Sequence, residues 1–516
     1  MGSAQSTPST PPSYSEKAAH ATPASSARRE PSAADLLAQL SLRSGSSRAP
    51  GATITNGDLA AWDEDFSSDP KHRLASTVLS KTNFNEALVS RAAQRKDQQV
   101  FNVKLSSEGN PVTDQKSSGR CWLFSSTNLI RILMMRKYDL EEFQLSQSYL
   151  FFYDSIAKAN WFLEQMLDLG DRDLDDRTVQ YFMQMPRSDG GQAAMFANLF
   201  ATYGLVPQSV YPESFNSSAT GKLDTLIESK LREYGIELRA LVSQARDALD
   251  EVATGKSAGE KKALASQAAR KRKEEQMAEV YRILAIALGQ PPKPNDPITW
   301  EYTSKSDKKY HKVETTPLEF YRKYCLVDMD AYVSLVNDPR NKYSSILEVE
   351  RLGNVVGGQA VKYINADIDA LKSTAVRLLK QDIPVWFGCD VGKFSSSALG
   401  IMDTDLYDLE QGFGIKLGMD KATRLRTGDS AMTHAMLITA VSLDEKTGKP
   451  TKWRVENSWG ATACDKGYML MSDAWFSEFV YQIAADRKHV PKELLDVFDH
   501  GESTLLPPWD PMGALA

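Results

Sequence analysis

The chain has 516 residues, of which 42% are hydrophobic and 25% are charged, and its formal net charge is −6. This length is too great for one small core and predicts two or three domains. A mildly acidic chain has no overall attraction for nucleic acid or an anionic membrane, so either contact would need a local basic patch.

The cysteines are few and scattered. Cys121, Cys325, Cys389 and Cys464 show neither metal-ligand spacing nor the regularity of a disulfide framework. So sparse a set in so long a chain is typical of a reducing compartment. No apolar run is long enough to cross a bilayer, and no secretory signal peptide is evident. We therefore expect a cytoplasmic protein without a transmembrane segment, a metal or a cofactor.

Residues 1–57 are rich in Ser, Ala, Pro and Thr. Such a stretch cannot bury enough apolar surface to order itself, so we predict a disordered tail. The opening MGSAQS places Gly2 and Ser6 as an N-myristoylation acceptor would, although a chance match in a tail of small residues is the simpler explanation. The arginines around DLLAQLSLR suggest a mitochondrial presequence, but Glu30 and Asp35 break its acid-poor rule.

Folded sequence is predicted to begin at Asp58. Residues 101–219 read as a loop followed by a long helix after Cys121 and further helical segments. Residues 220–363 begin with a charged, Ala-rich stretch of helical periodicity, LDTLIESKLREYGIELRALVSQARDALDEV, which predicts a mainly helical insertion.

From residue 364 to about residue 500 the pattern changes to strands. The segments DIPVWFGCDVG, HAMLITAVSL, TKWRVENSWG and GYMLMSD alternate or run apolar over short lengths between turn-rich stretches. A helical half followed by a β half predicts a two-lobed α+β protein with its cleft between the lobes.

Cys121 follows the loop QKSSGR and precedes the apolar run WLFSSTNLIRILMM. We expect it in the first turn of a helix, where free N–H groups and the helix dipole favour a thiolate. The thiolate is the form of cysteine that attacks a carbonyl, so this position suits a nucleophile. A buried structural cysteine is an equally good interpretation from position alone.

His434 opens one predicted strand and Asn457 lies near the end of the next. A hairpin centred between Glu445 and Lys446, inside the turn-rich stretch DEKTGKP, would place these two side chains next to each other. The amide oxygen of Asn457 would then accept from one imidazole N–H and turn the other nitrogen toward Cys121. The other histidines lack a comparable neighbourhood.

Two further residues fit the same chemistry. Gln115 lies in the loop before Cys121, where its side-chain N–H and the backbone N–H of the cysteine would form an oxyanion hole. Trp459 shares a strand face with Asn457 and would shield the bond between His434 and Asn457 from water. Ordinary core packing explains Trp459 equally well.

Three segments in this order resemble the signatures of papain-like cysteine peptidases. They are Gln115 with Gly119-x-Cys121-Trp122, then His434-Ala435, then Glu456-Asn457-Ser458-Trp459-Gly460. The motif Ser188-Asp189-Gly190-Gly191 further resembles the Gly-Gly wall of the family, whose backbone pairs with an extended substrate. The resemblance implies a papain-like two-lobed fold with a large helical insertion and an N-terminal extension.

The same resemblance assigns the roles. It implies Cys121 as nucleophile, His434 as base, Asn457 as the group that orients the histidine, and Gln115 in the oxyanion hole. Substrate contacts are expected at Asp189, Gly190, Gly191 and Trp459.

Departures from the family pattern are informative. Ser118 and Ser188 stand where secreted papains carry two cysteines that bond to each other, as expected of an intracellular member. Arg120 replaces the small residue before the nucleophile. His434 is about twice as far from Cys121 as in papain and cathepsins, which requires a large insertion between them.

This combination is similar to bleomycin hydrolase, the intracellular, self-compartmentalising branch of the family, from about residue 58 to the end. The branch implies a homohexamer, with residues 58–100 as a helical hook used in oligomerisation. It also implies that residues 501–516 form an arm in the cleft, where the carboxylate of Ala516 receives the substrate's α-amino group. The expected activity is removal of first residues from peptides with a free N-terminus, with hydrolysis of bleomycin's amide and homocysteine thiolactone.

Two alternatives remain. One is an endopeptidase of cathepsin type, which would ignore the substrate's free amine. The other adds weak binding of single-stranded nucleic acid by the basic run Arg270, Lys271, Arg272 and Lys273. A solvated helix face is the simpler interpretation of that run, because acidic residues interleave with it.

Overall fold

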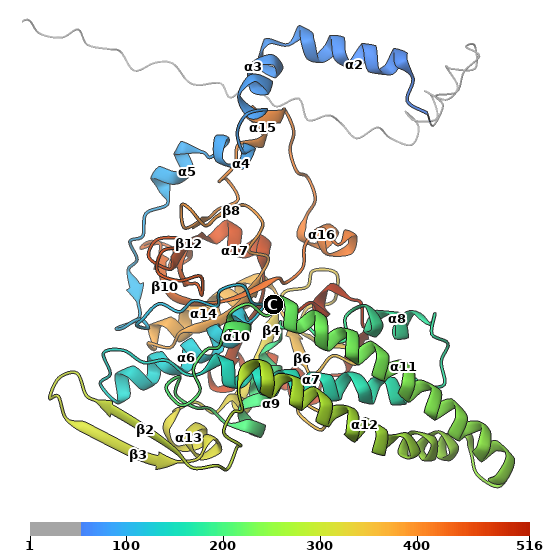
Figure 1. Cartoon of the computed structure of the whole chain (residues 1–516). Helices are drawn as coiled ribbons and strands as arrows, with labels where there is room; N and C mark the ends of the chain where they lie inside the picture. Colours follow the sequence, from blue (N-terminus) through green and yellow to red (C-terminus); the bar gives the residue numbers. More distant parts are fainter. Residues whose placement is uncertain (1–52, 516) are drawn as a thin grey trace, which may run out of the picture. The chain divides into compact units, whose positions relative to one another are not determined.

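A computed structural model of the chain describes residues 53–515 (Figure 1). The chain divides into two compact units, Met1–Thr77 and Val78–Ala516, and each is described by itself. Gly2 and Ala516, both singled out from the sequence, lie outside the described residues. Among the residues described, no helix is both long enough and apolar enough to cross a membrane.

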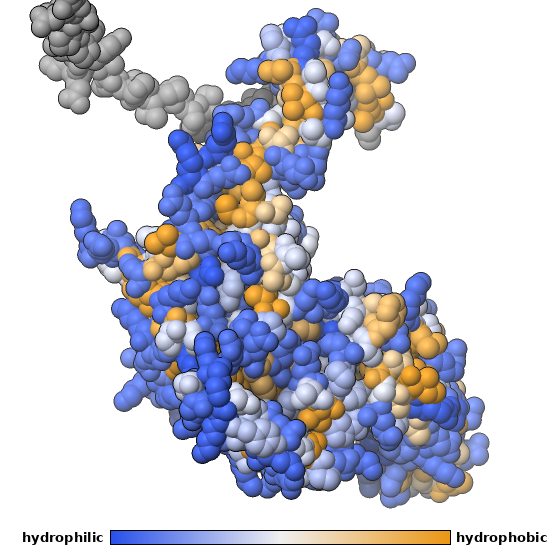
Figure 2. All heavy atoms as spheres, turned by 60° about the vertical axis from the view of Figure 1, so that its left-hand side comes forward, coloured by the Kyte–Doolittle hydropathy of each residue, from blue (hydrophilic) through white to orange (hydrophobic). Residues whose placement is uncertain are grey.

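The first unit carries α2 (Asn56–Ser68) and most of α3 (Pro70–Leu79), and neither helix has a buried residue. Leu59, Trp62 and Phe66 recur at helical spacing along α2 and are 53%, 57% and 43% exposed. Figure 2 shows apolar groups of this kind, in orange, on a mainly hydrophilic surface. Helix α2 therefore presents an apolar face to solvent.

The second unit begins with helices, and the expected long helix does start at Cys121. Helix α6 is buried over almost its whole length, including its polar residues. Its internal Ser125 and Thr127 satisfy their hydroxyl groups on backbone carbonyls of the preceding turn. The helices of this part are α4 (Phe84–Ala87), α5 (Arg91–Lys96), α6 (Cys121–Lys137), α7 (Gln147–Asp168), α8 (Arg177–Gln184), α9 (Ala193–Tyr203) and α10 (Phe215–Ser218).

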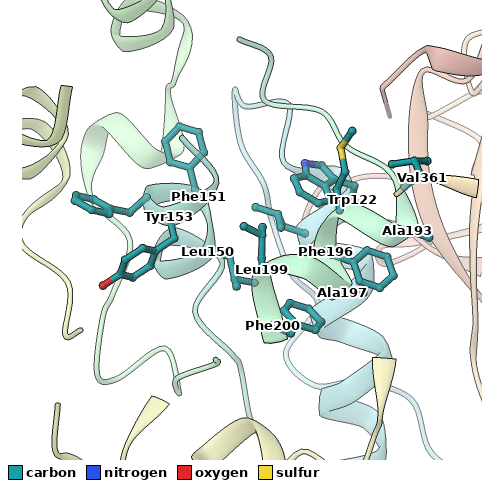
Figure 3. Close-up of a cluster of buried hydrophobic side chains, with 14 of the residues drawn as sticks. Trp122, Leu150, Phe151, Tyr153, Ala193, Phe196, Ala197, Leu199, Phe200 and Val361 are labelled. Carbon is teal, nitrogen blue, oxygen red and sulfur yellow. The ribbon is translucent and has the colours of Figure 1, made fainter. Parts of the chain in front are cut away.

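A cluster of aromatic and aliphatic side chains joins α6, α7 and α9. Figure 3 shows Trp122 of α6, Leu150 and Phe151 of α7, and Phe196 and Phe200 of α9 gathered in this core. Each of these side chains is almost completely shielded from water, which stabilises the fold by about 1.5–3 kcal/mol for each large apolar group. The core therefore fixes the start of α6, where Cys121 lies.

The predicted insertion begins with two long helices, α11 (Gly221–Val252) and α12 (Ala258–Leu288), which lie side by side (Figure 1). Both also pack on α7. The rest of the stretch 220–363 is less helical than expected. The hairpin β2 (Ile298–Thr303) and β3 (Tyr310–Thr315), the helix α13 (Pro317–Tyr324), and strands of the main sheet follow. Such short apolar runs cannot be told from helix by periodicity alone.

The main sheet has the order β14-β5-β6-β4-β13-β7-β10-β11-β12-β9-β8, with β1 paired to β10. β10 is antiparallel to both of its neighbours, β7 and β11. β7 and β10 bury most of their side chains on both faces. The strands are β1 (Val103–Lys104), β4 (Tyr332–Val336), β5 (Ser345–Val349), β6 (Lys362–Asn365), β7 (Val385–Cys389), β8 (Ser395–Ser396), β9 (Ile401–Met402), β10 (His434–Leu443), β11 (Pro450–Glu456), β12 (Tyr468–Ser472), β13 (Val480–Asp486) and β14 (Ser503–Leu506).

The remaining helices lie between and beside these strands. Helix α14 packs on β7, β10 and β13 and covers the second core cluster. These helices are η1 (Met329–Ala331), α14 (Ile368–Lys380), α15 (Leu409–Phe413), α16 (Lys421–Thr427), α17 (Asp473–Phe479), η2 (Arg487–His489), α18 (Lys492–His500) and η3 (Pro511–Gly513).

The hairpin of β10 and β11 is present, but its register differs from the expected one. Leu437 pairs with Glu456, and continuing that register would set His434 across from Trp459 instead of Asn457. The shift arises from a turn centred between Lys446 and Thr447, one residue later than predicted, which Gly448 allows with a φ of 68°. The two irregularities within the ladder offset each other, because the pairs Leu443–Pro450 and Leu437–Glu456 share one register. The two side chains still meet, because β11 ends at Glu456.

The last described segment returns across the molecule. β14 pairs in parallel with β5, and the chain then continues through η3 to Leu515. Tyr363 donates to the carbonyl of Met512 at 3.1 Å, and Arg340 pairs with Asp510 at 2.7 Å. The segment is therefore held by specific contacts, and it does not fray.

Candidate active site

Cys121 is the first residue of α6 and is 3% exposed. Burial raises the pKa of its thiol to about 11, opposed by hydrogen bonds from backbone N–H groups, among them those of Ala435 and Trp122. The helix terminus alone therefore does not hold this sulfur as a thiolate. A neighbouring base has to take its proton.

Arg120, the residue before Cys121, is completely buried. Its guanidinium lies 3.0 Å from the Glu213 carboxylate and donates to the Ser118 hydroxyl at 3.0 Å. These bonds fix the loop that leads into α6. Arg120, which replaces the small residue of the family pattern, therefore stabilises the loop from inside the protein.

His434 and Asn457 meet through a hydrogen bond of 2.9 Å between the imidazole Nε2 and the amide Oδ1. The backbone N–H of Ser458 donates to the same amide oxygen at 2.8 Å. An amide oxygen only accepts, so Nε2 carries the proton and Nδ1 keeps its lone pair. Burial lowers the pKa of His434 to about 4, which leaves the ring neutral and basic near pH 7.

Trp459 packs against His434, with ring centroids 5.1 Å apart and planes tilted by 32°. It also forms a backbone bridge with Asp114. The indole thus covers the imidazole and at the same time joins the loop before α6 to the end of β11.

Gln115 is held at both ends of its side chain. Ser458 donates from its hydroxyl to Gln115 Oε1 at 2.7 Å, and Gln115 Nε2 donates to the carbonyl of Ser118 at 2.6 Å. The backbone N–H of Gln115 donates to the Ser458 carbonyl at 2.8 Å. An amide nitrogen carries two hydrogens, so Nε2 keeps one for another acceptor.

The loop with the Gly-Gly motif is held in place by hydrogen bonds from a buried lysine. Lys158 donates to the carbonyls of Ser188 and Gly190 at 2.8 and 2.6 Å and pairs with Asp154 at 2.6 Å. Gly191 lies against the indole of Trp122, where an added Cβ would come within 2.5 Å of the ring. Only glycine fits there.

Asp189 is largely occupied within the protein. Its carboxylate accepts from the backbone N–H of Gly119 at 3.3 Å, from Arg187 at 3.0 Å, and from the hydroxyl of Thr220. The first two partners belong to the loops on either side of the cleft, and the third begins the insertion. This carboxylate therefore connects the wall of the cleft to the base of α11.

One cavity of about 590 Å³ brings most of these residues together. Asn457, Trp459 and Gly191 are absent from its lining. Its lining is Gln115, Ser117, Ser118, Gly119, Cys121, Met185, Arg187, Ser188, Asp189, Gly190, Thr220, Gly221, Asp224, Glu228, Thr433, His434 and Leu515.

Leu515 has a second role in the shape of the cleft. It also lines a neighbouring cavity of about 470 Å³ with apolar walls that include Trp161, Phe182 and Met432. The preceding residue, Ala514, accepts a hydrogen bond from the side chain of Gln192. The end of the described chain therefore stands between two cavities of one cleft.

Several residues of this cavity were not expected from the sequence. Asp224 and Glu228 come from the first turns of α11, and Arg187 lies beside the Gly-Gly motif. The helical periodicity of α11 predicts the helix but not which of its faces meets Cys121. No local sequence signal identifies them, because their place depends on packing between distant segments.

Three of the four cations of the basic run on α12 are paired with acids. Arg270 lies 2.6 Å from Glu164, Arg272 lies 2.7 Å from Glu237, and Lys273 lies 3.2 Å from Glu164. These pairs favour the interpretation of the run as a helix face with its charges balanced. Nucleic-acid binding remains a prediction.

Known proteins match this chain over most of its length. The family model described as "Peptidase C1-like family" matches residues 53–513. Bleomycin hydrolase of Homo sapiens is 44% identical over 472 residues, covering 90% of this chain and 99% of that protein. "Cysteine proteinase 1, mitochondrial" of Saccharomyces cerevisiae is 41% identical over 470 residues, covering 90% of this chain and 93% of that protein.

Among solved structures, PepW of Lactobacillus rhamnosis is similar in fold. It superposes with a TM-score of 0.81 at 40% sequence identity and covers 90% of this chain and 100% of PepW. The described fold and these matches agree with the α+β, papain-like architecture expected from the sequence.

Proposed function

The chain belongs to the Peptidase C1-like family and is a cysteine peptidase of bleomycin hydrolase type, and from this premise we propose that it removes first residues from peptides. The observation that carries the proposal is the position of Leu515, which lines the same cavity as Cys121 and His434. Because the C-terminal segment occupies one end of the cleft, a substrate has room for few residues on the N-terminal side of its scissile bond.

In the proposed reaction, His434 Nδ1 takes the thiol proton as Cys121 Sγ attacks the scissile carbonyl carbon. The backbone N–H of Cys121 and the remaining N–H of Gln115 Nε2 stabilise the developing oxyanion. The imidazolium then gives its proton to the leaving amine, and an acyl-enzyme remains. Water, deprotonated by His434, attacks the acyl carbon and releases the carboxylic acid and the thiol.

Asn457 fits the role of a positioning residue in this scheme. Its hydrogen bond to Nε2 fixes the tautomer in which Nδ1 is the base. Because the amide is neutral, it orients the imidazolium without neutralising it.

The free amine of the substrate is proposed to meet the carboxylate of Ala516. Leu515, which precedes it in the sequence, lines the cavity that contains Cys121 and His434. An ion pair in a partly enclosed cleft is stronger than one in bulk water. The same acyl-enzyme chemistry would accept bleomycin's amide, as the name of the human relative suggests, and the thioester of homocysteine thiolactone.

The test compares a free aminoacyl amide with its N-acetylated form, in the full chain and in a variant lacking Leu515 and Ala516. The full chain is expected to cleave only the free form, and the shortened variant to gain cleavage of internal bonds. Equal rates on free and acetylated substrates in the full chain would instead favour the cathepsin-type alternative. Cys121→Ala serves as the inactive control for both.

We also propose self-association into a hexamer, with the apolar face of α2 seated on another copy. Leu59, Trp62 and Phe66 give this helix the kind of surface that soluble proteins cover by association. Cytoplasmic residence is proposed, and the name of the yeast relative lends some support to a mitochondrial alternative.

A further inference from the structure

Helix α11 contributes a charged wall to the catalytic cavity. Asp224 and Glu228 are one turn apart on the same face of the helix, and both line the cavity that contains Cys121 and His434. Their side chains are 19% and 24% exposed. They are therefore partly shielded from water but open to whatever occupies the cavity.

The cavity lining is acidic in balance. It carries the carboxylates of Asp189, Asp224 and Glu228 against the single guanidinium of Arg187. Arg187 is completely buried and is shared between Asp189 and Asp224, so it neutralises no more than one of them. The residues that line the cavity therefore carry a net negative formal charge.

Glu228 is the carboxylate least occupied by the protein. Its Oε2 lies 3.1 Å from Arg232, while Oε1 has no hydrogen-bond partner among residues 53–515. Arg232 also donates to the carbonyls of Met183 and Gln184 at 2.8 and 2.9 Å. Its guanidinium hydrogen bonds are therefore shared between Glu228 and the end of α8. Glu228 thus keeps an acceptor for a ligand.

The position of this wall relative to Cys121 decides which part of a substrate can meet it. In the proposed reaction the carbonyl of the acylating residue is at the sulfur of Cys121, so this residue occupies the cavity. Gly119 and Gly190 line the cavity together with Asp224 and Glu228. The side chain of the acylating residue therefore shares the cavity with Glu228.

We propose that Asp224 and Glu228 form a subsite that favours substrates whose acylating residue is Lys or Arg. The inference rests on the proposed peptidase function, in which this residue is the first of the peptide. A cationic side chain entering a partly shielded, negatively charged cavity gains charge-assisted hydrogen bonds that a neutral side chain does not.

The experiment uses two aminoacyl amides of 7-amino-4-methylcoumarin, one of arginine and one of citrulline. Citrulline has nearly the same shape as arginine without its charge. The measured quantity is the ratio of kcat/KM for the arginine amide to kcat/KM for the citrulline amide. For the wild-type chain we expect a ratio between about 2 and 5, the upper part of the range for solvent-accessible ion pairs.

Variants of α11 localise the effect. Glu228→Gln is expected to bring the ratio close to one, and Glu228→Lys to invert it. Glu233→Gln, a change of the same type on an exposed position of α11 outside the cavity, is the matched control and should keep the wild-type ratio. Equal unfolding temperatures of the variants would exclude misfolding as the cause.

A wild-type ratio near one, or a ratio that Glu228→Gln and Glu228→Lys leave unchanged, would overturn the subsite. Failure of the aminopeptidase proposal is recognised separately, because neither free amide would then be preferred over its acetylated form. In that event the ratio of kcat/KM is measured on the acetylated arginine and citrulline amides. That ratio then tests the subsite independently of the aminopeptidase proposal.

Discussion

At the scale of single residues, burial governs the protonation of the pair that the proposed reaction uses. It raises the pKa of Cys121 to about 11 and lowers that of His434 to about 4. The thiol and the imidazole that line this cavity are therefore both neutral near pH 7. In the proposed reaction the proton passes from sulfur to nitrogen as the substrate carbonyl is attacked.

We predict that kcat/KM is steady around neutral pH and falls as the pH drops through about 4, where His434 gains a proton and stops acting as a base. The measurement is the pH profile of kcat/KM on a free aminoacyl amide. Asn457→Asp places an anion beside the imidazole, raises its pKa and should move the acid limb to higher pH. An acid limb that stays in place in this variant would mean that another group controls it.

The donor on Gln115 gives a second prediction at this scale. Gln115→Ala should lower kcat by about 10²–10³ and change KM little, because the lost hydrogen bond strengthens only as the oxyanion forms. Ser458→Ala should lower kcat less, since the amide is retained and only its orientation is released. A rise in KM alone for Gln115→Ala would place this side chain in ground-state binding.

Sequence pattern and structure agree best where a residue acts through its immediate neighbours. The loop before Cys121, the helix after it and the hairpin carrying His434 are all local features, and each is present. Asp224 and Ser458 illustrate what pattern cannot supply. Asp224 reaches the cavity only because α11 packs on α7, and Ser458 orients Gln115 across a contact between distant segments.

At the scale of elements, a buried ion pair joins the helix of Cys121 to the strand that precedes Asn457. Arg131 of α6 and Glu456 of β11 are 2.9 Å apart, and both side chains are completely shielded from water. Asn128 of α6 also donates to Glu456 at 3.0 Å. The pair thus connects the two halves of the site behind the reacting atoms.

We predict that Arg131→Met lowers the free energy of unfolding by about 3–5 kcal/mol, because it leaves a buried carboxylate without its partner. Glu456→Gln in addition should restore part of this loss, since the unpaired charge is then gone. Denaturant unfolding of the wild type, both single variants and the double variant measures the coupling. Strictly additive losses would show that the two side chains stabilise the fold independently.

The register of β10 and β11 shows the limit of element-scale prediction. A turn-rich stretch locates a hairpin only approximately, and here the turn is centred one residue later than predicted. Strand β11 ends early enough at Glu456 for Asn457 to turn back toward His434. The contact between the two side chains is therefore present although the predicted register is not.

At the scale of the whole molecule, the architecture followed from the sequence more fully than the assembly did. Hydrophobic periodicity predicts the order of the helical and strand-rich parts, except for the strands within residues 298–363. An association depends instead on surfaces from separate chains. The apolar face of α2 is the one described feature of the first unit that bears on it.

We predict that Trp62→Glu reduces the native mass of the protein below that of the wild type, because a charge replaces an apolar contact between copies. Light scattering coupled to size exclusion measures it. Glu64→Lys, on the opposite face of α2, is the matched control and should keep the wild-type mass. An unchanged mass for Trp62→Glu, or a wild type that is already a single chain, would contradict the role of this face.

The bonds around Ser458 have one consequence for the protein in motion. The residue orients Gln115 through its hydroxyl and binds the Gln115 backbone through its carbonyl, while its own N–H contacts the amide of Asn457. A fluctuation that separates the segment of Ser458 from the loop of Gln115 would break these bonds together. The proposed oxyanion donor, Gln115, and the support of His434 by Asn457 would then be lost in the same event. Amide hydrogen exchange at Gln115 and at Gly460, which is bonded to Thr113 across the same junction, would then report directly the fraction of molecules momentarily unable to turn over.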